Sequence, residues 1–296
     1  MNHNTTVVKK FQGVLPKNYF YKYNKIIRCN NVIDVVRMTR KPECLIKRLK
    51  GKQYVHIKTG EVKEYMPKIE GIQFRNIRSL KKIFRDLRQL ITTNFEGGED
   101  ETFLTLTYRE QHSDPKKIYK DLDIFNKRLR RAIPGVKYIH IVEPHASGNF
   151  HVHSLIKHEN NIELPMTYET FFPMWEHGYV TVEDLYNVDN IGAYFIAYFS
   201  NLELTDKEAE KYAAQDDVKE KNGKKYIKGK RLDYYPDYMQ IYRGSRNLKK
   251  PEQTSNVPDE FNKTYEAEYK ITTTDSNGNS GETYVKKEQH RKRNKE

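Results

Sequence analysis

The stretch Tyr138–Ile156, with the sequence YIHIVEPHASGNFHVHSLI, decides how the surrounding chain is expected to fold. Its two ends are rich in β-branched, aromatic and apolar residues, whereas Pro, Gly and Asn gather in the middle. This pattern is typical of two antiparallel strands joined by a tight connection. Residues two apart on a strand point to the same face, so His151 and His153 are expected to present their imidazoles side by side.

A metal site is predicted at this hairpin because Glu143, on the opposite arm, can lie beside either histidine. A carboxylate and two imidazoles, with open positions left for water and substrate phosphate, suit Mg²⁺ or Mn²⁺. Alternatively, the two histidines are half-buried, hydrogen-bonded residues with a structural role. His145 in the turn and His140 are alternative ligands. His140 has the opposite strand parity from Glu143 and is expected at the surface or in packing, so we rank Glu143 above both.

The composition is basic and poor in cysteine. The 296 residues include 53 Lys and Arg against 40 Asp and Glu, a net charge of +13, together with 22 tyrosines. This excess predicts a polyanionic partner, most commonly nucleic acid, with an acidic membrane surface as the rival. Cys29 and Cys44 form no CxxC pair, so neither a zinc knuckle nor a disulfide framework is expected. We find no signal-like or membrane-spanning apolar run, which predicts a soluble, intracellular protein.

The hairpin falls within an alternation of strands and helices that predicts an α+β fold. Besides the hairpin, strands are expected at 103–108 and 179–182, and helices at 113–134 and 168–175. The resulting order of strand, helix, strand, strand, helix, strand matches the split βαβ pattern of ferredoxin-like folds. We therefore predict an antiparallel sheet with helices on one face.

A further helix, expected from Asp189 to Asn201, carries Tyr194 and Tyr198 four residues apart, so both hydroxyls lie on one helical face. A tyrosine that attacks a DNA phosphate needs a metal or basic group to polarise the phosphate, and its phenol needs local help to lose a proton. Both tyrosines are therefore candidate nucleophiles beside the metal-binding hairpin. Alternatively, they are packing residues of an apolar helix.

Three motifs of the chain resemble, in order and spacing, those of HUH endonucleases, and more narrowly the rolling-circle replication initiator (Rep) proteins of small bacterial phages and plasmids. They are FLTLTY at 103–108, the block from Glu143 to His153, and YFIAY at 194–198. The chain departs from the family pattern at Ala197 and Asn201, where such proteins usually have lysines three residues after each tyrosine.

This resemblance implies that His151 and His153 bind a divalent metal with Glu143 as third ligand, and that Tyr194 and Tyr198 are nucleophiles. The implied activity is metal-dependent, site-specific nicking and joining of single-stranded DNA through a 5′-phosphotyrosine intermediate. It would start replication at an origin in the cytoplasm of a bacterial host, with the host helicase and polymerase as partners and no membrane. A relaxase or transposase of the same superfamily, or a non-catalytic nucleic-acid-binding module, is the alternative.

Four regions are expected along the chain. They are a basic N-terminal region with a small hairpin and an amphipathic helix (1–97), an HUH endonuclease domain (98–204), a basic Tyr-rich extension (205–251) and a polar tail (252–296). In the tail a hairpin is possible around Asn277, and disorder is expected from His290. Two basic segments are predicted to contact DNA through Arg78, Lys81, Lys82, Arg85, Arg88, Lys224, Lys225, Lys228, Lys230 and Arg231. For the helix, a merely solvated basic face is the alternative.

Overall fold

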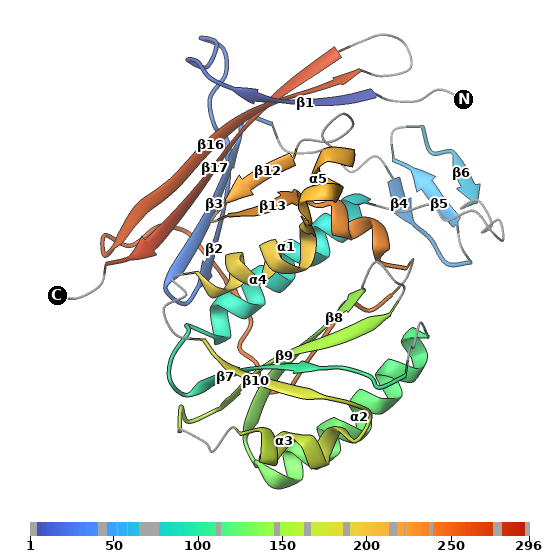
Figure 1. Cartoon of the computed structure of the whole chain (residues 1–296). Coiled ribbons are helices and arrows are strands. Elements are labelled where there is room, and N and C mark those ends of the chain that lie inside the picture. The colour runs from blue at the N-terminus through green and yellow to red at the C-terminus, as the bar shows by residue number, and fades with distance from the viewer. Residues whose placement is uncertain are drawn as a thin grey trace. The chain divides into compact units, whose positions relative to one another are not determined.

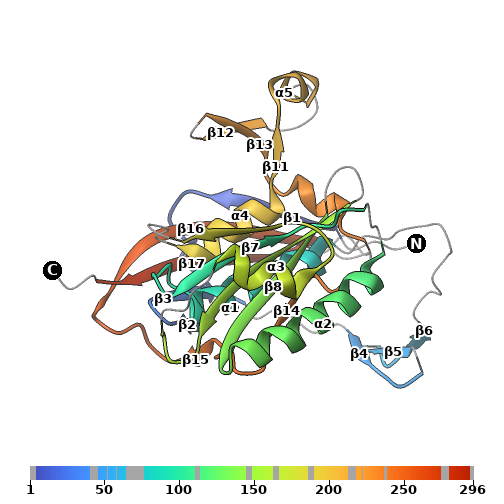
Figure 2. The same cartoon turned by 60° about the horizontal axis from the view of Figure 1, so that its bottom comes forward.

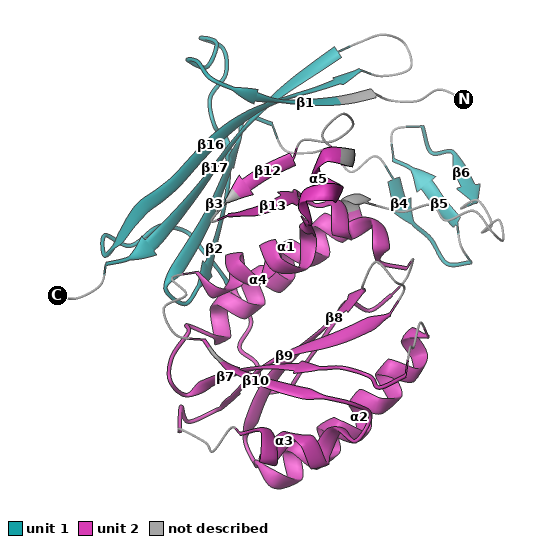
Figure 3. Cartoon of the chain, in the orientation of Figure 1, with its two compact units in different colours: residues 1–74, 252–296 teal, residues 75–251 magenta. Residues whose placement is uncertain are grey.

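A computed structural model describes residues 5–40, 46–51, 53–57, 59–64, 77–110, 114–144, 149–162, 167–185, 190–212, 218–221, 223–236, 239–274 and 280–293. The chain divides into two compact units, one comprising residues 1–74 and 252–296 and the other residues 75–251 (Figure 3). The second unit contains both the histidine hairpin and the tyrosine helix. Within the described residues, no helix combines the length and the hydropathy that crossing a membrane requires.

The centre of the second unit is a five-stranded antiparallel sheet in the order β10-β7-β9-β8-β14 (Figure 1). Its strands are β7 (Glu101–Leu106), β8 (Val136–Pro144), β9 (Phe150–His158), β10 (Val180–Asp184) and β14 (Tyr242–Gly244). Helix α2 (Pro115–Ala132) connects β7 to β8, and α3 (Tyr168–Trp175) connects β9 to β10. The predicted α+β class and split βαβ pattern are confirmed, and β14 adds a fifth strand beside β8.

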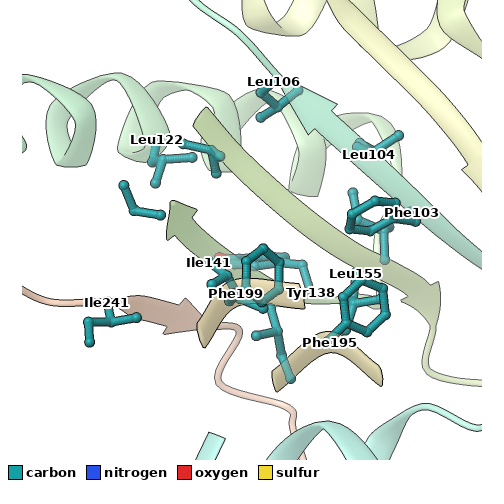
Figure 4. Close-up of a cluster of buried hydrophobic side chains, with 14 of the residues drawn as sticks. Phe103, Leu104, Leu106, Leu122, Tyr138, Ile141, Leu155, Phe195, Phe199 and Ile241 are labelled. Carbon is teal, nitrogen blue, oxygen red and sulfur yellow. The ribbon is translucent and has the colours of Figure 1, made fainter. Parts of the chain in front are cut away.

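Helices cover both faces of this sheet. The predicted layer of α2 and α3 lies on one face, and α1 (Ile77–Asn94) and α4 (Ile191–Ser200) form a second layer on the other (Figure 1). Phe195 of α4 packs on Phe103 of β7 with ring centroids 4.8 Å apart (Figure 4). Because both faces are covered, every residue of β8 is buried, which explains its nearly continuous apolar sequence.

The sequence placed α1 in the N-terminal region, yet it belongs to the second unit because its buried residues Phe84, Leu87 and Ile91 join the core of that unit. Its approach to α4 depends on Gly192. A Cβ atom on this residue would lie 2.2 Å from Thr92 Oγ1 and 2.7 Å from the Arg88 carbonyl oxygen. Only a glycine therefore permits the two helices to pack at this separation.

The helix ends follow their sequence signals. The Asp114 carboxylate accepts a hydrogen bond from the Lys116 N–H at 2.9 Å, and Pro115 occupies the first position of α2, as predicted. At α4, Asn190 Oδ1 accepts from the Ala193 N–H at 3.0 Å. This cap fixes where the tyrosine helix begins.

A smaller subdomain follows α4 and stands away from the five-stranded sheet (Figure 2). Its sheet has the order β11-β13-β12 and consists of β11 (Leu202–Leu204), β12 (Val218–Lys221) and β13 (Lys224–Ile227). Helix α5 (Asp206–Tyr212) packs on it through a cluster that contains Leu204, Ala209 and Ile227. The short helix η1 (Lys230–Tyr234) then returns the chain to the end of α4, and buried Leu232 joins the main core.

The first unit is mainly a six-stranded antiparallel sheet in the order β1-β16-β17-β3-β2-β15. Its strands are β1 (Thr5–Phe11), β2 (Tyr23–Cys29), β3 (Val32–Met38), β15 (Glu252–Thr254), β16 (Phe261–Thr274) and β17 (Ser280–Lys292). A separate small sheet contains β4 (Ile46–Arg48), β5 (Gln53–His56) and β6 (Val62–Glu64), and β5 with β6 forms the hairpin predicted in the N-terminal region.

The polar tail contributes much of this six-stranded sheet. Strands β16 and β17 pair along their length around the turn at which the sequence suggests a hairpin. The sequence also predicts disorder from His290, but β17 continues to Lys292 because His290 and Arg291 pair with Ile33 and Val32 of β3. This pairing satisfies backbone groups that a disordered tail would leave to water.

Candidate metal centre

The pairing of β8 with β9 assembles the three predicted metal ligands. Glu143 lies directly opposite His151, and His153 lies opposite Ile141. Because alternate residues of a strand point to the same face, Glu143, His151 and His153 project together toward the face covered by α4. One ligand atom from each residue lies within 4.8 Å of the other two. This buried group can hold a metal ion.

His153 is fixed by contacts on both ring nitrogens. Its Nδ1 lies 3.0 Å from Thr105 Oγ1, and its Nε2 lies 2.5 Å from Glu143 Oε2. The ring also stacks on Phe103, with centroids 5.4 Å apart. A hydroxyl on the far nitrogen of a metal-binding histidine sets the orientation and tautomer of the ring. Thr105 therefore holds Nε2 toward the Glu143 carboxylate.

Burial keeps this histidine in the form that binds metals. It lowers the pKa of His153 to about 4, and the Glu183 charge opposes this effect by a smaller amount. The Arg231 guanidinium forms an ion pair with the other oxygen of Glu143 and so offsets the increase in pKa that this carboxylate would cause. His153 is consequently a neutral ligand at neutral pH.

Arg231 is held between the metal ligands and the end of α4. Its Nη1 forms the ion pair with Glu143 Oε1, and its Nε donates to the Asn201 carbonyl oxygen at 2.9 Å. Burial lowers the pKa of Arg231, and the neighbouring Tyr235 and Tyr234 oppose the shift. An arginine keeps its charge even so, because its usual pKa is above 12. The buried carboxylate is therefore neutralised by a buried cation.

The donor chemistry of the group fits a divalent cation. One carboxylate and two neutral imidazoles supply oxygen and nitrogen ligands, and half-buried His151 lies at the more accessible side of the group. The ring centroid of His151 is 6.4 Å from that of His153. The three donors leave coordination positions for water or a phosphate oxygen.

The alternative ligands are not part of this group. His140 points to the opposite face, where its Nδ1 is 2.7 Å from Ser154 Oγ and its Nε2 is 2.7 Å from Asn126 Oδ1. It is fully buried, so it is a packing residue rather than a surface residue. Burial, and secondarily the Arg243 charge, lowers the pKa of His140 to about 3. His145 lies outside the described residues.

The tyrosines lie beside the metal-ligand group, on the exposed side of α4. Tyr198 and Tyr194 are 43% and 51% exposed, whereas Phe195 and Phe199 form the buried side. The Tyr198 ring lies 5.5 Å from the His153 ring, between centroids. Burial raises the pKa of Tyr198, with smaller increases from Tyr194, Glu183 and Glu203. Its hydroxyl therefore keeps its proton at neutral pH.

The basic residues predicted to contact DNA have different environments. On α1, Lys81, Lys82 and Arg85 are exposed, while Arg88 is half-buried and its carbonyl faces α4. The Arg78 side chain lies outside the described set. In the later segment, Lys228 is exposed. Ion pairs there join Lys224 to Glu203 at 3.0 Å, Lys225 to Asp206 at 2.9 Å and Lys230 to Asp233 at 3.8 Å.

Sequence reasoning did not identify Thr105 and Asn201 as partners in this centre, nor Arg231 as a contact of Glu143. The FLTLTY run placed Thr105 on a strand, and only its register against β9, with Thr105 opposite His153, connects the two. Asn201 was noted as a departure from a motif, and its carbonyl anchors Arg231. These contacts depend on tertiary structure and left no local signal in the sequence.

Residues 101–203 match the family model described as replication-associated protein ORF2. The matched stretch runs from β7 to β11, so it includes the Glu-His-His group and the tyrosine helix. The match supports a replication-related function, and with it an involvement of DNA. No curated protein and no solved structure matches the chain.

Proposed function

We propose that this chain initiates rolling-circle replication by nicking and joining single-stranded DNA at an origin. One observation carries the proposal: Glu143, His151 and His153 bring their ligand atoms within 4.8 Å of one another, beside the partly exposed Tyr198 of α4. The match of residues 101–203 to a replication-associated family supports it.

Glu143, His151 and His153 would hold the Mg²⁺ or Mn²⁺ ion, which when bound polarises the scissile phosphodiester. The hydroxyl oxygen of Tyr194 or Tyr198 attacks phosphorus and gives up its proton to solvent. A bond forms between the tyrosine oxygen and phosphorus, and the bond from phosphorus to the 3′ oxygen breaks. The 3′ oxygen takes a proton from solvent, and the resulting 3′ hydroxyl primes the host polymerase while the host helicase unwinds the duplex.

Two tyrosines on one helix allow a second transfer. If one tyrosine retains the 5′ phosphate, the other can cleave the newly made strand, and attack by a free 3′ hydroxyl on a phosphotyrosine then rejoins DNA ends. Both side chains are exposed enough for a strand to reach them. Lys81, Lys82 and Arg85 on the exposed side of α1 are proposed to contact the DNA backbone.

The test is a denaturing gel with labelled single-stranded oligonucleotides that tile the replicon encoding the chain, in Mn²⁺ or in EDTA. Wild-type protein should form a covalent adduct in Mn²⁺ only. The double variant Tyr194→Phe, Tyr198→Phe should form none, and His151→Ala should lose the adduct as well. Tyr168→Phe is a matched control, because Tyr168 is also 43% exposed but lies on α3. Full nicking by the double variant would rule out the tyrosine mechanism.

A non-catalytic nucleic-acid-binding module is the second candidate, because Ala197 and Asn201 stand where the family resemblance implies lysines. Such a module would retard the oligonucleotides on a native gel without adduct or cleavage. A relaxase or transposase of the same superfamily would instead form the adduct on transfer-origin or transposon-end DNA.

A further inference from the structure

Helix α4 offers no cation to a phosphate that its tyrosines attack. Its sequence from Ile191 to Ser200 contains no charged residue. Ala197 and Asn201 fall on the same helical stripe as the two tyrosines, since residues three and four apart are neighbours on a helix surface. Negative charge builds up on a phosphoryl group in the transition state and needs positioned donors. A cation from another element would have to provide them.

Arg231 is placed to do so, because its guanidinium spans the distance from the end of α4 to the metal-ligand group. Its Nε donates to the carbonyl of Asn201, the residue that ends the helix, at 2.9 Å. Its Nη1 forms an ion pair with Glu143 Oε1, and the side chain is only 16% exposed. The cation therefore lies next to both the candidate nucleophiles and a metal ligand.

The backbone that carries Arg231 is also fixed. The Gly229 N–H donates to Asn201 Oδ1 at 3.1 Å, and Gly229 adopts a left-handed conformation with φ of 75°. The following residues are anchored in the core by Leu232 and by Tyr235, whose ring lies 5.6 Å from that of Phe84. By contrast, the ion pairs of Lys224 and Lys225 are largely exposed. Arg231 is a positioned charge, unlike these surface lysines.

We propose that Arg231 is the phosphate-binding cation of this centre and takes the place of a cation that α4 lacks. This inference rests on the proposed nicking function. In the DNA-free protein, Arg231 neutralises Glu143. When Glu143 ligates a metal and DNA is bound, the guanidinium donates to non-bridging oxygens of the scissile phosphate, while its Nε stays on the Asn201 carbonyl. A planar guanidinium suits this role because it presents several donors in a fixed geometry.

The inference separates metal binding from nicking, so the test compares the two in Arg231→Gln. Calorimetric titration of the DNA-free protein with Mn²⁺ should give an affinity equal to or tighter than that of the wild type, because a cation that competes for Glu143 is gone. Single-turnover nicking in saturating Mn²⁺ should slow by about 10²-fold or more, the usual effect of removing one transition-state donor.

Arg243→Gln is the matched control. Arg243 Nη1 also bridges a backbone carbonyl, that of Tyr119 at 3.1 Å, and a carboxylate, Asp123 Oδ1 at 2.9 Å, on the opposite face of the sheet. Its Mn²⁺ affinity and nicking rate should equal those of the wild type. Thermal unfolding of both variants reports whether either loses its fold. If Arg231→Gln does not fold, Arg231→Lys, which keeps the charge but cannot make both contacts, should nick at an intermediate rate.

Rescue distinguishes a phosphate contact from an orienting role. Adding Ala197→Lys to Arg231→Gln places a cation on the tyrosine stripe and should restore part of the nicking rate. The inference is overturned if Arg231→Gln nicks like the wild type, or if its Mn²⁺ affinity and nicking fall together without rescue, since Arg231 would then only orient Glu143. Absence of nicking by the wild type would overturn the proposed function, and the inference with it.

Discussion

His153 and His140 lie on opposite faces of one strand pair, and both are buried. Burial lowers the pKa of both, to about 4 for His153 and about 3 for His140. Their partners differ: His140 is bonded to the neutral side chains of Ser154 and Asn126, whereas His153 is bonded to Thr105 and the charged Glu143. A lowered pKa therefore marks burial alone, and the charge of the partner separates the candidate ligand from the packing residue.

The hydrogen-bond directions explain why only one of the two is available to a metal. As the amide is oriented, Asn126 Oδ1 can only accept, so His140 donates from Nε2 and accepts the Ser154 hydroxyl proton at Nδ1. Both of its nitrogens are satisfied. At His153 the partner of Nε2 is a carboxylate that can itself bind the metal, so a cation can replace the shared hydrogen bond.

The sharpest way to break this comparison is His153→Gln, which keeps a polar side chain of similar size. It removes one of three ligands from the metal-binding group. We expect Mn²⁺ binding to be lost and nicking to fall by about 10³-fold or more, since a bound metal contributes several kcal/mol to transition-state stabilisation. Calorimetry and single-turnover gels measure the two effects. Wild-type Mn²⁺ affinity in this variant would show that His153 is not a ligand.

The matching substitution on the other face, His140→Ala, should affect stability instead. It leaves a cavity and deprives the buried Ser154 and Asn126 of their partner. We expect a loss of roughly 2–4 kcal/mol in the free energy of unfolding, measured by urea denaturation. Mn²⁺ affinity of the folded protein should not change. A weakened metal affinity without loss of stability would contradict the assignment of the two faces.

A smaller effect is expected from the hydroxyls that hold the two rings. Thr105→Val removes the bond to His153 Nδ1 with little change of shape and should weaken Mn²⁺ binding by about 10–100-fold, as for other partners of metal ligands. Ser154→Ala removes the equivalent bond to His140 and should cost about 1 kcal/mol of stability with unchanged Mn²⁺ affinity. Equal effects of the two variants on metal binding would remove the distinction between the faces.

Local patterns predicted much of the fold around the centre. The alternation of residues around Glu143 and His153 is sufficient to place their side chains on one face of a hairpin, and the Asp114–Pro115 signal correctly starts α2. The α+β class and the order of the ferredoxin-like strands followed from these local elements. Each depends on neighbours in the sequence, which is why sequence reasoning reached them.

The rest depends on pairings between distant segments. Strand β1 pairs with β16, with Val8 opposite Ile271, and three-residue strands such as β14 are too short to give a periodic pattern. Likewise, the basic composition of the segment after β11 predicted DNA contacts, but it did not reveal that Arg231 faces Glu143. Charge composition identifies cations, whereas only the tertiary structure shows which carboxylates they face.

The smallest effect we predict concerns pH and sharpens the role of His140. Its folded-state pKa of about 3 lies below the value of about 6.5 in an unfolded chain, so only the unfolded state takes up this proton between those values. This contribution to stability is therefore complete above about pH 6.5 and is lost progressively as the pH falls toward 3. Between pH 7.5 and 5.5 the loss from His140 should be about 1 kcal/mol.

Urea denaturation at both pH values, in EDTA, measures this loss in the wild type and in His140→Ala. The variant lacks the His140 term but keeps the other histidines, including the buried His153, so the difference between the two pH dependences isolates His140. We expect the variant to lose less stability on acidification by about 1 kcal/mol. An identical pH dependence in the two proteins would mean that His140 binds its proton equally in the folded and unfolded states, and its closed hydrogen-bond pattern would then be wrong.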